Sequence, residues 1–159
     1  MSAPPLPAED VQTYPRPAVA EPMAHRVEIF LGGKLIADTE RAMRVLETHH
    51  APTYYIPPDD VDADLSALPG QSFCEWKGMA RYFDVAANGQ TAARAAWTYV
   101  NPTAGFIGIA GFLAFYASKM GLCRVGGVEV EPQPGDFYGG WITPNLTGIV
   151  KGGPGTEHW

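Results

Sequence analysis

The sequence feature that most constrains the fold is a set of glycine-containing dipeptides between short apolar runs: Gly32-Gly33, Asn88-Gly89 and Gly126-Gly127. A two-residue loop between antiparallel strands needs positive φ at its central positions, which Gly and Asn adopt most readily. The first dipeptide separates residues 27–31 from residues 34–38, and both runs have strand composition. The dipeptides therefore predict β-hairpins, and hence antiparallel sheet.

The remaining elements are predicted from apolar pattern and from turn residues. We expect strands at residues 40–50, 72–76, 79–86 and 91–100, a bend at Lys77-Gly78, and a short helical turn from Asp59 through Leu65. Strand alternation predicts that Thr91, Ala93, Ala95, Trp97 and Tyr99 share one face. Residues 104–116 are apolar on both faces, which predicts a buried central element consisting of a turn and then a strand.

These elements predict a mainly β protein, with one compact antiparallel domain at residues 25–131 and one or two short helical turns. Residues 1–24 are rich in proline, which excludes helices and central strands, so a tail or surface strap is expected there. Residues 132–159 combine Gly and Pro with Phe137, Tyr138, Trp141 and Trp159. Disordered tails seldom carry so many aromatic residues. We therefore predict that this C-terminal extension is an ordered strap packed on the domain.

Composition limits the possible partners. Hydrophobic residues make up 46% of the 159-residue chain and charged residues 18%, as in globular proteins. The net charge is −6, and the 11 Lys and Arg residues form no cluster, which argues against nucleic-acid binding. The longest apolar stretch is too short to cross a bilayer, and no secretory signal is present. We expect a cytoplasmic protein that binds neither nucleic acid nor membrane. Its two cysteines could form one disulfide, but free thiols are expected in a reducing compartment.

Several motifs resemble cofactor or metal sites but do not fit them. Gly105-x-x-Gly108-x-x-Gly111 lies outside any βαβ unit, so it is not a dinucleotide-binding loop. His49 and His50 would point to opposite faces of a strand and could not bind one ion together. Cys74 as a nucleophile would need a nearby base, and a small buried side chain is its more common role. We predict no cofactor and no metal.

An acid, an amine and several aromatic rings form the candidate ligand site: Glu47, Tyr55, Lys77, Tyr82, Trp97 and Tyr99. On a strand, Glu47 would share the apolar face of Met43 and Val45, where a carboxylate must be paired or neutralised; alternatively, it reaches solvent at a rim. The amine of Lys77 can bind an anion or pair with Glu47. The rings can stack on a flat ligand or face a cation.

Four stretches carry a resemblance to a known family: residues 47–61 with Thr-His-His-Ala-Pro, 74–82 with Glu-Trp-Lys-Gly, 96–102 with Trp-Thr-Tyr-Val-Asn-Pro, and 109–116 with Ala-Gly-Phe-Leu-Ala-Phe-Tyr. In this order, across about residues 26–130, they resemble domain-of-unknown-function family 427. The resemblance implies a mainly antiparallel domain similar to the β-tent architecture of zinc-binding and methionine-sulfoxide-reductase folds. The chain lacks the paired Cys-x-x-Cys motifs of those folds. The C-terminal extension resembles one found in a bacterial subgroup.

The family also carries a nucleotidyltransferase-like label. Magnesium-dependent nucleotidyl transfer needs acidic metal-binding pairs, which this sequence does not show. We therefore expect a domain that binds a small molecule in the Lys, Glu and aromatic pocket. One alternative is a transferase- or hydrolase-like enzyme on the same site, with Lys77 as electrophile or base, Glu47 as acid or base, and a tyrosine such as Tyr82 as proton donor. The other is a module that forms homo-oligomers through the C-terminal strap.

Overall fold

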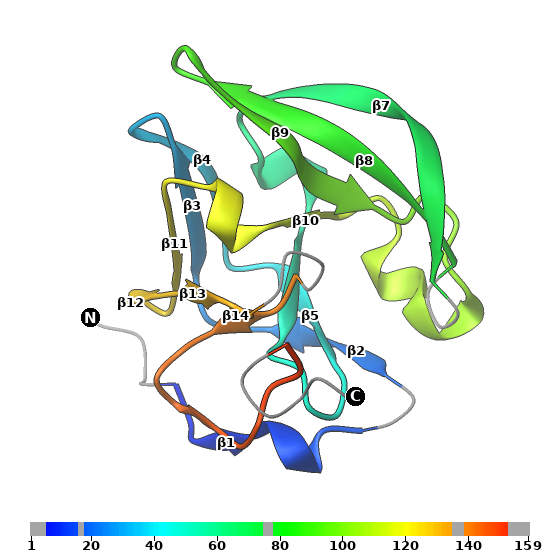
Figure 1. The fold of residues 1–159 in the computed structure, drawn as a ribbon, viewed down its shortest axis with the longest axis vertical. Helices are drawn as coiled ribbons and strands as arrows, with labels where there is room; N and C mark the ends of the chain where they lie inside the picture. Colours follow the sequence, from blue (N-terminus) through cyan, green and yellow to red (C-terminus); the bar gives the residue numbers. More distant parts are fainter. Residues whose placement is uncertain (1–5, 16–17, 75–77, 135–138, 153–159) are drawn as a thin grey trace.

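Two antiparallel sheets and two short strand pairs make up the fold in the computed structural model of the chain (Figure 1). The structure describes residues 6–15, 18–74, 78–134 and 139–152. The prediction of a mainly β, antiparallel fold is confirmed. Among the described residues, no helix has the length and apolar character needed to span a membrane.

The larger sheet has seven strands in the order β2-β5-β6-β10-β9-β8-β7. Their bounds are β2 Val19–Met23, β5 Ala42–Leu46, β6 Thr53–Ile56, β7 Asp64–Cys74, β8 Gly78–Ala87, β9 Gln90–Thr98 and β10 Leu113–Phe115. The smaller sheet has the order β12-β11-β3-β4, with β3 Val27–Leu31, β4 Lys34–Thr39, β11 Leu122–Val125 and β12 Val128–Glu129. In Figure 1, β7, β8 and β9 form a long curved arm at the top of the molecule.

The hairpin predictions are confirmed. Gly32 and Gly33 have φ of 61° and 79° between β3 and β4, and Gly126 and Gly127 have φ of 57° and 80° between β11 and β12. The Asn88-Gly89 turn joins β8 to β9, with positive φ at both residues. These positions favour Gly or Asn because most other residues are strained at positive φ.

The buried central element is also confirmed. Residues 104–116 contain the 3-10 helix η3, Ala104–Ile109, and then β10, the middle strand of the seven-stranded sheet. Leu113, Ala114 and Phe115 are all buried. A strand that is covered on both faces needs apolar residues at every position, which explains the absence of alternation here.

The prediction of a helical turn through Leu65 is wrong beyond Asp60. The 3-10 helix η2 covers only Pro58–Asp60, and β7 begins at Asp64 and continues through a register shift at Pro69-Gly70. Val61, Ala63 and Leu65 all pack against the core. Their spacing of two residues is the period of a strand, and it outweighs the helical spacing of Val61 and Leu65.

The apolar core has two main parts, one on each side of the seven-stranded sheet. One part lies between the two sheets and includes Ile29, Ile36, Ile56, Val85 and Val125. The other part, which we call the aromatic face, lies on the opposite side of the seven-stranded sheet; it is built from Val45, Tyr55, Ala80, Trp97, Tyr99, Phe106, Ile109 and Ala114 and is partly covered by η3.

Segments near both ends of the chain pack on the seven-stranded sheet. In the Pro-rich region, β1 covers Glu9–Asp10 and is followed by the 3-10 helix η1, Val11–Thr13. The next strand, β2, lies at the edge of the sheet, where Pro22 is tolerated. At the C-terminal side lie β13, Glu131–Pro132, β14, Trp141–Ile142, and β15, Leu146–Thr147, which pairs in parallel with β1. We call residues 6–15 and 139–151, which meet through this pairing, the clasp.

Trp141 anchors the C-terminal half of the clasp. Its side chain is 1% exposed, its indole Nε1–H donates to the carbonyl oxygen of Phe115 at 3.0 Å, and its ring centroid lies 5.2 Å from that of Tyr54. The other predicted aromatic anchors, Phe137, Tyr138 and Trp159, lie outside the described residues.

We expect Trp141→Ala to lower the free energy of unfolding by about 3–5 kcal/mol, because it leaves a cavity and an unpaired carbonyl. Urea denaturation followed by circular dichroism measures this change. Ile149→Ala is the matched control, since Ile149 lies in the same segment but is 52% exposed. It should change stability by less than about 0.5 kcal/mol. Equal effects of the two substitutions would contradict the anchoring role.

Candidate functional site

The structure brings four of the predicted site residues together on the aromatic face. Tyr55 on β6, Trp97 on β9 and Tyr99 are buried, and Tyr82 on β8 packs against them. The Tyr55 ring lies 6.4 Å from the rings of both Trp97 and Tyr99. Rings at such distances stabilise one another by about 0.5–1.5 kcal/mol beyond their burial. Buried Tyr55, Trp97 and Tyr99 therefore form the floor of this face.

Glu47 and Lys77 are placed differently. The prediction of a strand through His50 is wrong, because β5 ends at Leu46 and His49 turns the chain with a φ of 63°. Glu47 therefore lies in a turn, where its Oε2 is 3.7 Å from Nε2 of His50. Its side chain is 23% exposed, which agrees with the alternative of a carboxylate at a rim. Lys77 lies outside the described residues.

Gln133 selects one tautomer of the neutral form of His50. The side-chain Oε1 of Gln133 accepts from the backbone N–H of Ala51, and its Nε2–H donates to the carbonyl of Lys151, which fixes the orientation of the amide. The same Nε2 lies 3.3 Å from Nδ1 of His50, so Nδ1 must be the acceptor. The proton of neutral His50 is thus on Nε2, the nitrogen that faces Glu47.

β9 contains a wide irregularity beside the aromatic face, and the cationic residue Arg94 lies in it. Between the pairs Phe83–Ala96 and Val85–Ala92, β8 supplies Asp84 alone, whereas β9 supplies residues 93–95. Arg94 within this bulge has a φ of 48°, and its backbone N–H donates to Oδ1 of Asp84 at 2.8 Å. Bulges of this kind redirect a side chain, and left-handed backbone in a non-glycine residue is strained.

The bulge also corrects the predicted face of β9. Trp97 and Tyr99 belong to the aromatic face as expected, but Ala95 packs into the core between the two sheets. The extra residues interrupt the two-residue alternation on which the prediction relied.

Two cations and two tyrosines meet at this end, and we call Tyr82, Arg94, Tyr116 and Lys119 the cation–aromatic cluster. The guanidinium carbon of Arg94 lies 4.1 Å from the Tyr82 ring centroid, and Nζ of Lys119 lies 5.5 Å from that of Tyr116. The Tyr116 ring is 4.5 Å from the Trp97 ring, so the cluster is continuous with the floor. The pKa of Tyr116 is raised by burial and by the nearby Tyr82, and it is lowered to a smaller extent by Arg94.

The sequence analysis missed Arg94, Tyr116 and Lys119. One signal was available: Arg94 and Lys119 bound a run, residues 95–118, that contains no Asp, Glu, Lys or Arg. Their convergence depends on the β9 bulge and on the 3-10 helix η4, Ala117–Lys119, which follows β10. Neither feature can be read from apolar periodicity.

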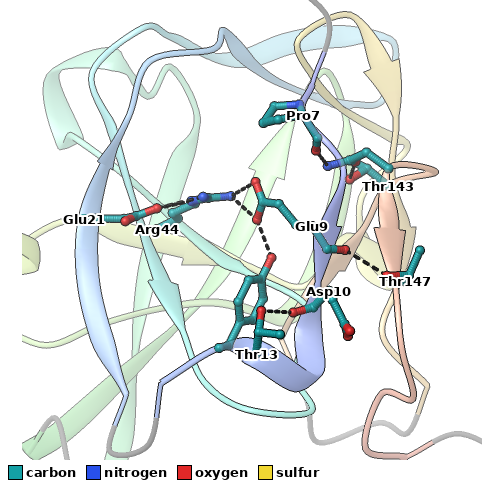
Figure 2. Close-up of polar contacts among 10 residues, drawn as sticks. Pro7, Glu9, Asp10, Thr13, Glu21, Arg44, Thr143 and Thr147 are labelled. Atoms are coloured by element: carbon teal, nitrogen blue, oxygen red, sulfur yellow. Dashed lines mark hydrogen bonds and ion pairs between the residues drawn. The ribbon is translucent and has the colours of Figure 1, made fainter.

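A second polar site ties the N-terminal half of the clasp to the sheet (Figure 2). The guanidinium of Arg44 on β5 lies between Glu9 and Glu21, with nitrogen–oxygen distances of 3.1 Å and 2.7 Å. The Tyr14 hydroxyl donates to Oε1 of Glu9 at 2.5 Å. Burial would lower the pKa of Arg44, but the hydrogen bond to Glu21 and the charge of Glu9 outweigh it and raise the pKa.

A small cavity adjoins this ion-pair network. It has a volume of about 70 Å³ and is lined by Leu6, Pro7, Glu9, Met23, His25, Arg44, Tyr54, Asn145 and Leu146. Ligand pockets usually exceed about 300 Å³, so this cavity is too small for a typical ligand. The described residues contain no group of three or more His, Cys, Asp or Glu side chains that could hold a metal ion.

Comparison with known proteins gives one family. A family model described as "Domain of unknown function (DUF427)" matches residues 19–126, which is more than half of the chain. The match includes the seven-stranded sheet and the cation–aromatic cluster, whereas the clasp lies outside it. A search of curated proteins found no match.

We expect Gly139→Ala to disturb the aromatic face, because a Cβ at Gly139 would lie 2.2 Å from Cη2 of Trp97. The clasp or the ring must move, which should destabilise the fold by about 1–3 kcal/mol and change tryptophan fluorescence. Gly105→Ala is the control, since nothing lies within 4 Å of its added Cβ. A Gly139 variant with wild-type stability and emission would contradict this contact.

We expect alkaline pH to weaken the fold partly through Tyr54, because burial raises the pKa of Tyr54 to about 12 while Arg44 opposes this shift. In the unfolded chain, tyrosine ionises near pH ~10. The stabilisation is fully present below about pH 10 and is lost as pH rises towards about 12; a shift of this size corresponds to roughly 3 kcal/mol.

Urea denaturation between pH 9 and 12 should therefore show a steeper loss of stability in the wild type than in Tyr54→Phe. Burial raises the pKa values of Tyr14 and Cys123 in the same direction, so some alkaline loss remains in the variant. Identical pH slopes for the two proteins would contradict the role of Tyr54.

Proposed function

Because the chain belongs to the DUF427 family, a domain of unknown function, we propose its function from geometry: the domain binds a small planar molecule at the cation–aromatic cluster. The single observation that carries the proposal is Arg94, an exposed cation held in left-handed backbone and stacked 4.1 Å above the Tyr82 ring. Strained residues persist where surrounding structure holds them, and they concentrate at ligand sites.

The two ends of the aromatic face differ in their access to a ligand. Tyr55, Trp97 and Tyr99 are each at most 7% exposed, so they shape the site from below. Tyr82 and Tyr116 are half-buried, and Arg94 and Lys119 are exposed. A planar ligand can stack on a tyrosine ring or on the flat guanidinium, and a stacked ring contributes about 1–3 kcal/mol.

An enzyme is the second candidate, and the fixed tautomer of His50 favours it. A histidine whose Nδ1 is held by Gln133 and whose Nε2 faces a carboxylate is suited to proton transfer. In this version Glu47 and His50 act as an acid–base pair on a bound molecule. Recovery of the ligand unchanged after incubation would contradict it, whereas turnover that is lost in His50→Gln would support it.

Self-association through the C-terminal strap has weaker support. Trp141, the described aromatic residue of that strap, is buried in the core of its own chain. It is therefore not available to a second copy without unfolding part of the domain. Light scattering of the protein truncated after Val130 tests this alternative, which requires a change of oligomeric state.

We expect planar aromatic metabolites, screened by thermal shift, to include at least one that stabilises the wild type and has little effect on Tyr82→Leu. The matched control is Phe30→Leu, because Phe30 lies under Arg124 at 5.6 Å in the same kind of contact on the other sheet. Loss of one stacked ring should weaken binding by about tenfold or more. The proposal is contradicted if no planar compound binds, or if the two variants lose binding equally.

A further inference from the structure

The only two charges in residues 91–119 are positive, and the fold brings them together. Arg94 and Lys119 belong to a chain of net charge −6, and 24 uncharged residues separate them. Nζ of Lys119 donates to the carbonyl oxygens of Ala93 and Arg94, at 3.0 Å and 3.3 Å. The ammonium is therefore anchored to the backbone of the same bulge that carries the Arg94 guanidinium.

Neither cation forms an ion pair with a carboxylate among the residues that the structure describes. Asp84 does contact Arg94, but its Oδ1 accepts a hydrogen bond from the backbone N–H of Arg94 and not from the guanidinium. This differs from Arg44, which two glutamates neutralise. No described carboxylate neutralises Arg94 or Lys119, so a bound anion can pair with both.

The hydrogen-bonding groups at this end also suit an oxyanion. An ammonium has three N–H donors, and the two carbonyl contacts of Lys119 leave one. Arg94 adds a planar fork that binds phosphate and carboxylate with two parallel bonds. The Arg94 guanidinium lies over the Tyr82 ring, and the Lys119 ammonium lies over the Tyr116 ring. Two cations and two tyrosine rings thus lie beside the aromatic floor.

We infer that the planar ligand carries a phosphate or carboxylate group, which Arg94 and Lys119 bind while its ring stacks at the cluster. This inference rests on the proposed function, because it gives the chemical class of the molecule that binds there. Tyr82 and Tyr116 supply the ring contacts, and the two cations select the charged form of a ligand over its neutral form. Charge-assisted hydrogen bonds are stronger than neutral ones, so this selection should be at least about tenfold.

The test uses matched probe pairs that share a ring and differ in charge: nicotinamide with nicotinate, and adenosine with AMP. Isothermal titration measures each dissociation constant for the full-length protein at low salt. We expect nicotinate or AMP to bind about tenfold or more tightly than its neutral partner. Which pair discriminates distinguishes a carboxylate from a phosphate ligand.

Arg94→Gln and Lys119→Gln should remove this preference, and Arg124→Gln should retain it, because Arg124 stacks on Phe30 in the four-stranded sheet. Should Arg94→Gln disturb folding, Arg94→Gly also removes the guanidinium and relieves the left-handed strain at this position.

Each outcome separates the two proposals. Equal affinity for the charged and neutral members of both pairs overturns the anion inference and leaves planar-ligand binding intact. Absence of binding by all four probes overturns the inference. In that case the thermal-shift screen of planar metabolites tests the proposed function separately. An anion preference that survives in the Arg94 and Lys119 variants also overturns the inference.

Discussion

Burial of both faces of the seven-stranded sheet is the constraint on which the rest of the structure depends. Its middle strand, β10, is covered by the four-stranded sheet on one side and by the aromatic face on the other. Such a strand cannot carry a charge on either face without a large desolvation cost. The long uncharged run around β10 follows from this, and so do the positions of the nearest charges, Arg94 and Lys119, beyond its two ends.

Covering the sheet also explains the clasp. Segments near both chain ends pack beside β5, where Val11, Tyr14 and the partly buried Leu146 contact Leu46. Two kinds of contact hold them: Trp141 by apolar burial and one indole hydrogen bond, and Glu9 by the ion pair with Arg44. The partly buried pair has two further partners, because the Tyr14 hydroxyl donates to Glu9 and Arg44 also donates to Glu21. A partly buried charge that lost one of these partners would destabilise the fold.

The sequence pattern predicted those elements whose backbone conformation is determined by their own residues. Gly32-Gly33, Asn88-Gly89 and Gly126-Gly127 specify their turns locally, and the apolar run at β10 specifies burial on both faces. The shared face of Trp97 and Tyr99 also followed from strand alternation, whereas Tyr55 was assigned to the site by residue type. The end of β5 was not predicted, because His49 turns the chain where periodicity shows no break. Glu47 was consequently assigned to a strand face when it lies in a turn. The length of β7 was not predicted either, because the strand continues through Pro69-Gly70, residues that usually end an element.

The largest departure from strand periodicity is the bulge of β9, and it coincides with the proposed site. Three residues of β9 oppose Asp84 alone, which moves Ala95 to the opposite face and leaves Arg94 in left-handed backbone. A regular strand would give neither the Arg94–Tyr82 stack nor the carbonyls that anchor Lys119. Local rules are expected to fail where a protein accepts strain for binding or catalysis. Because one irregularity both departs from the sequence prediction and assembles two cations beside two tyrosines, the bulge is the structural origin of the proposed site.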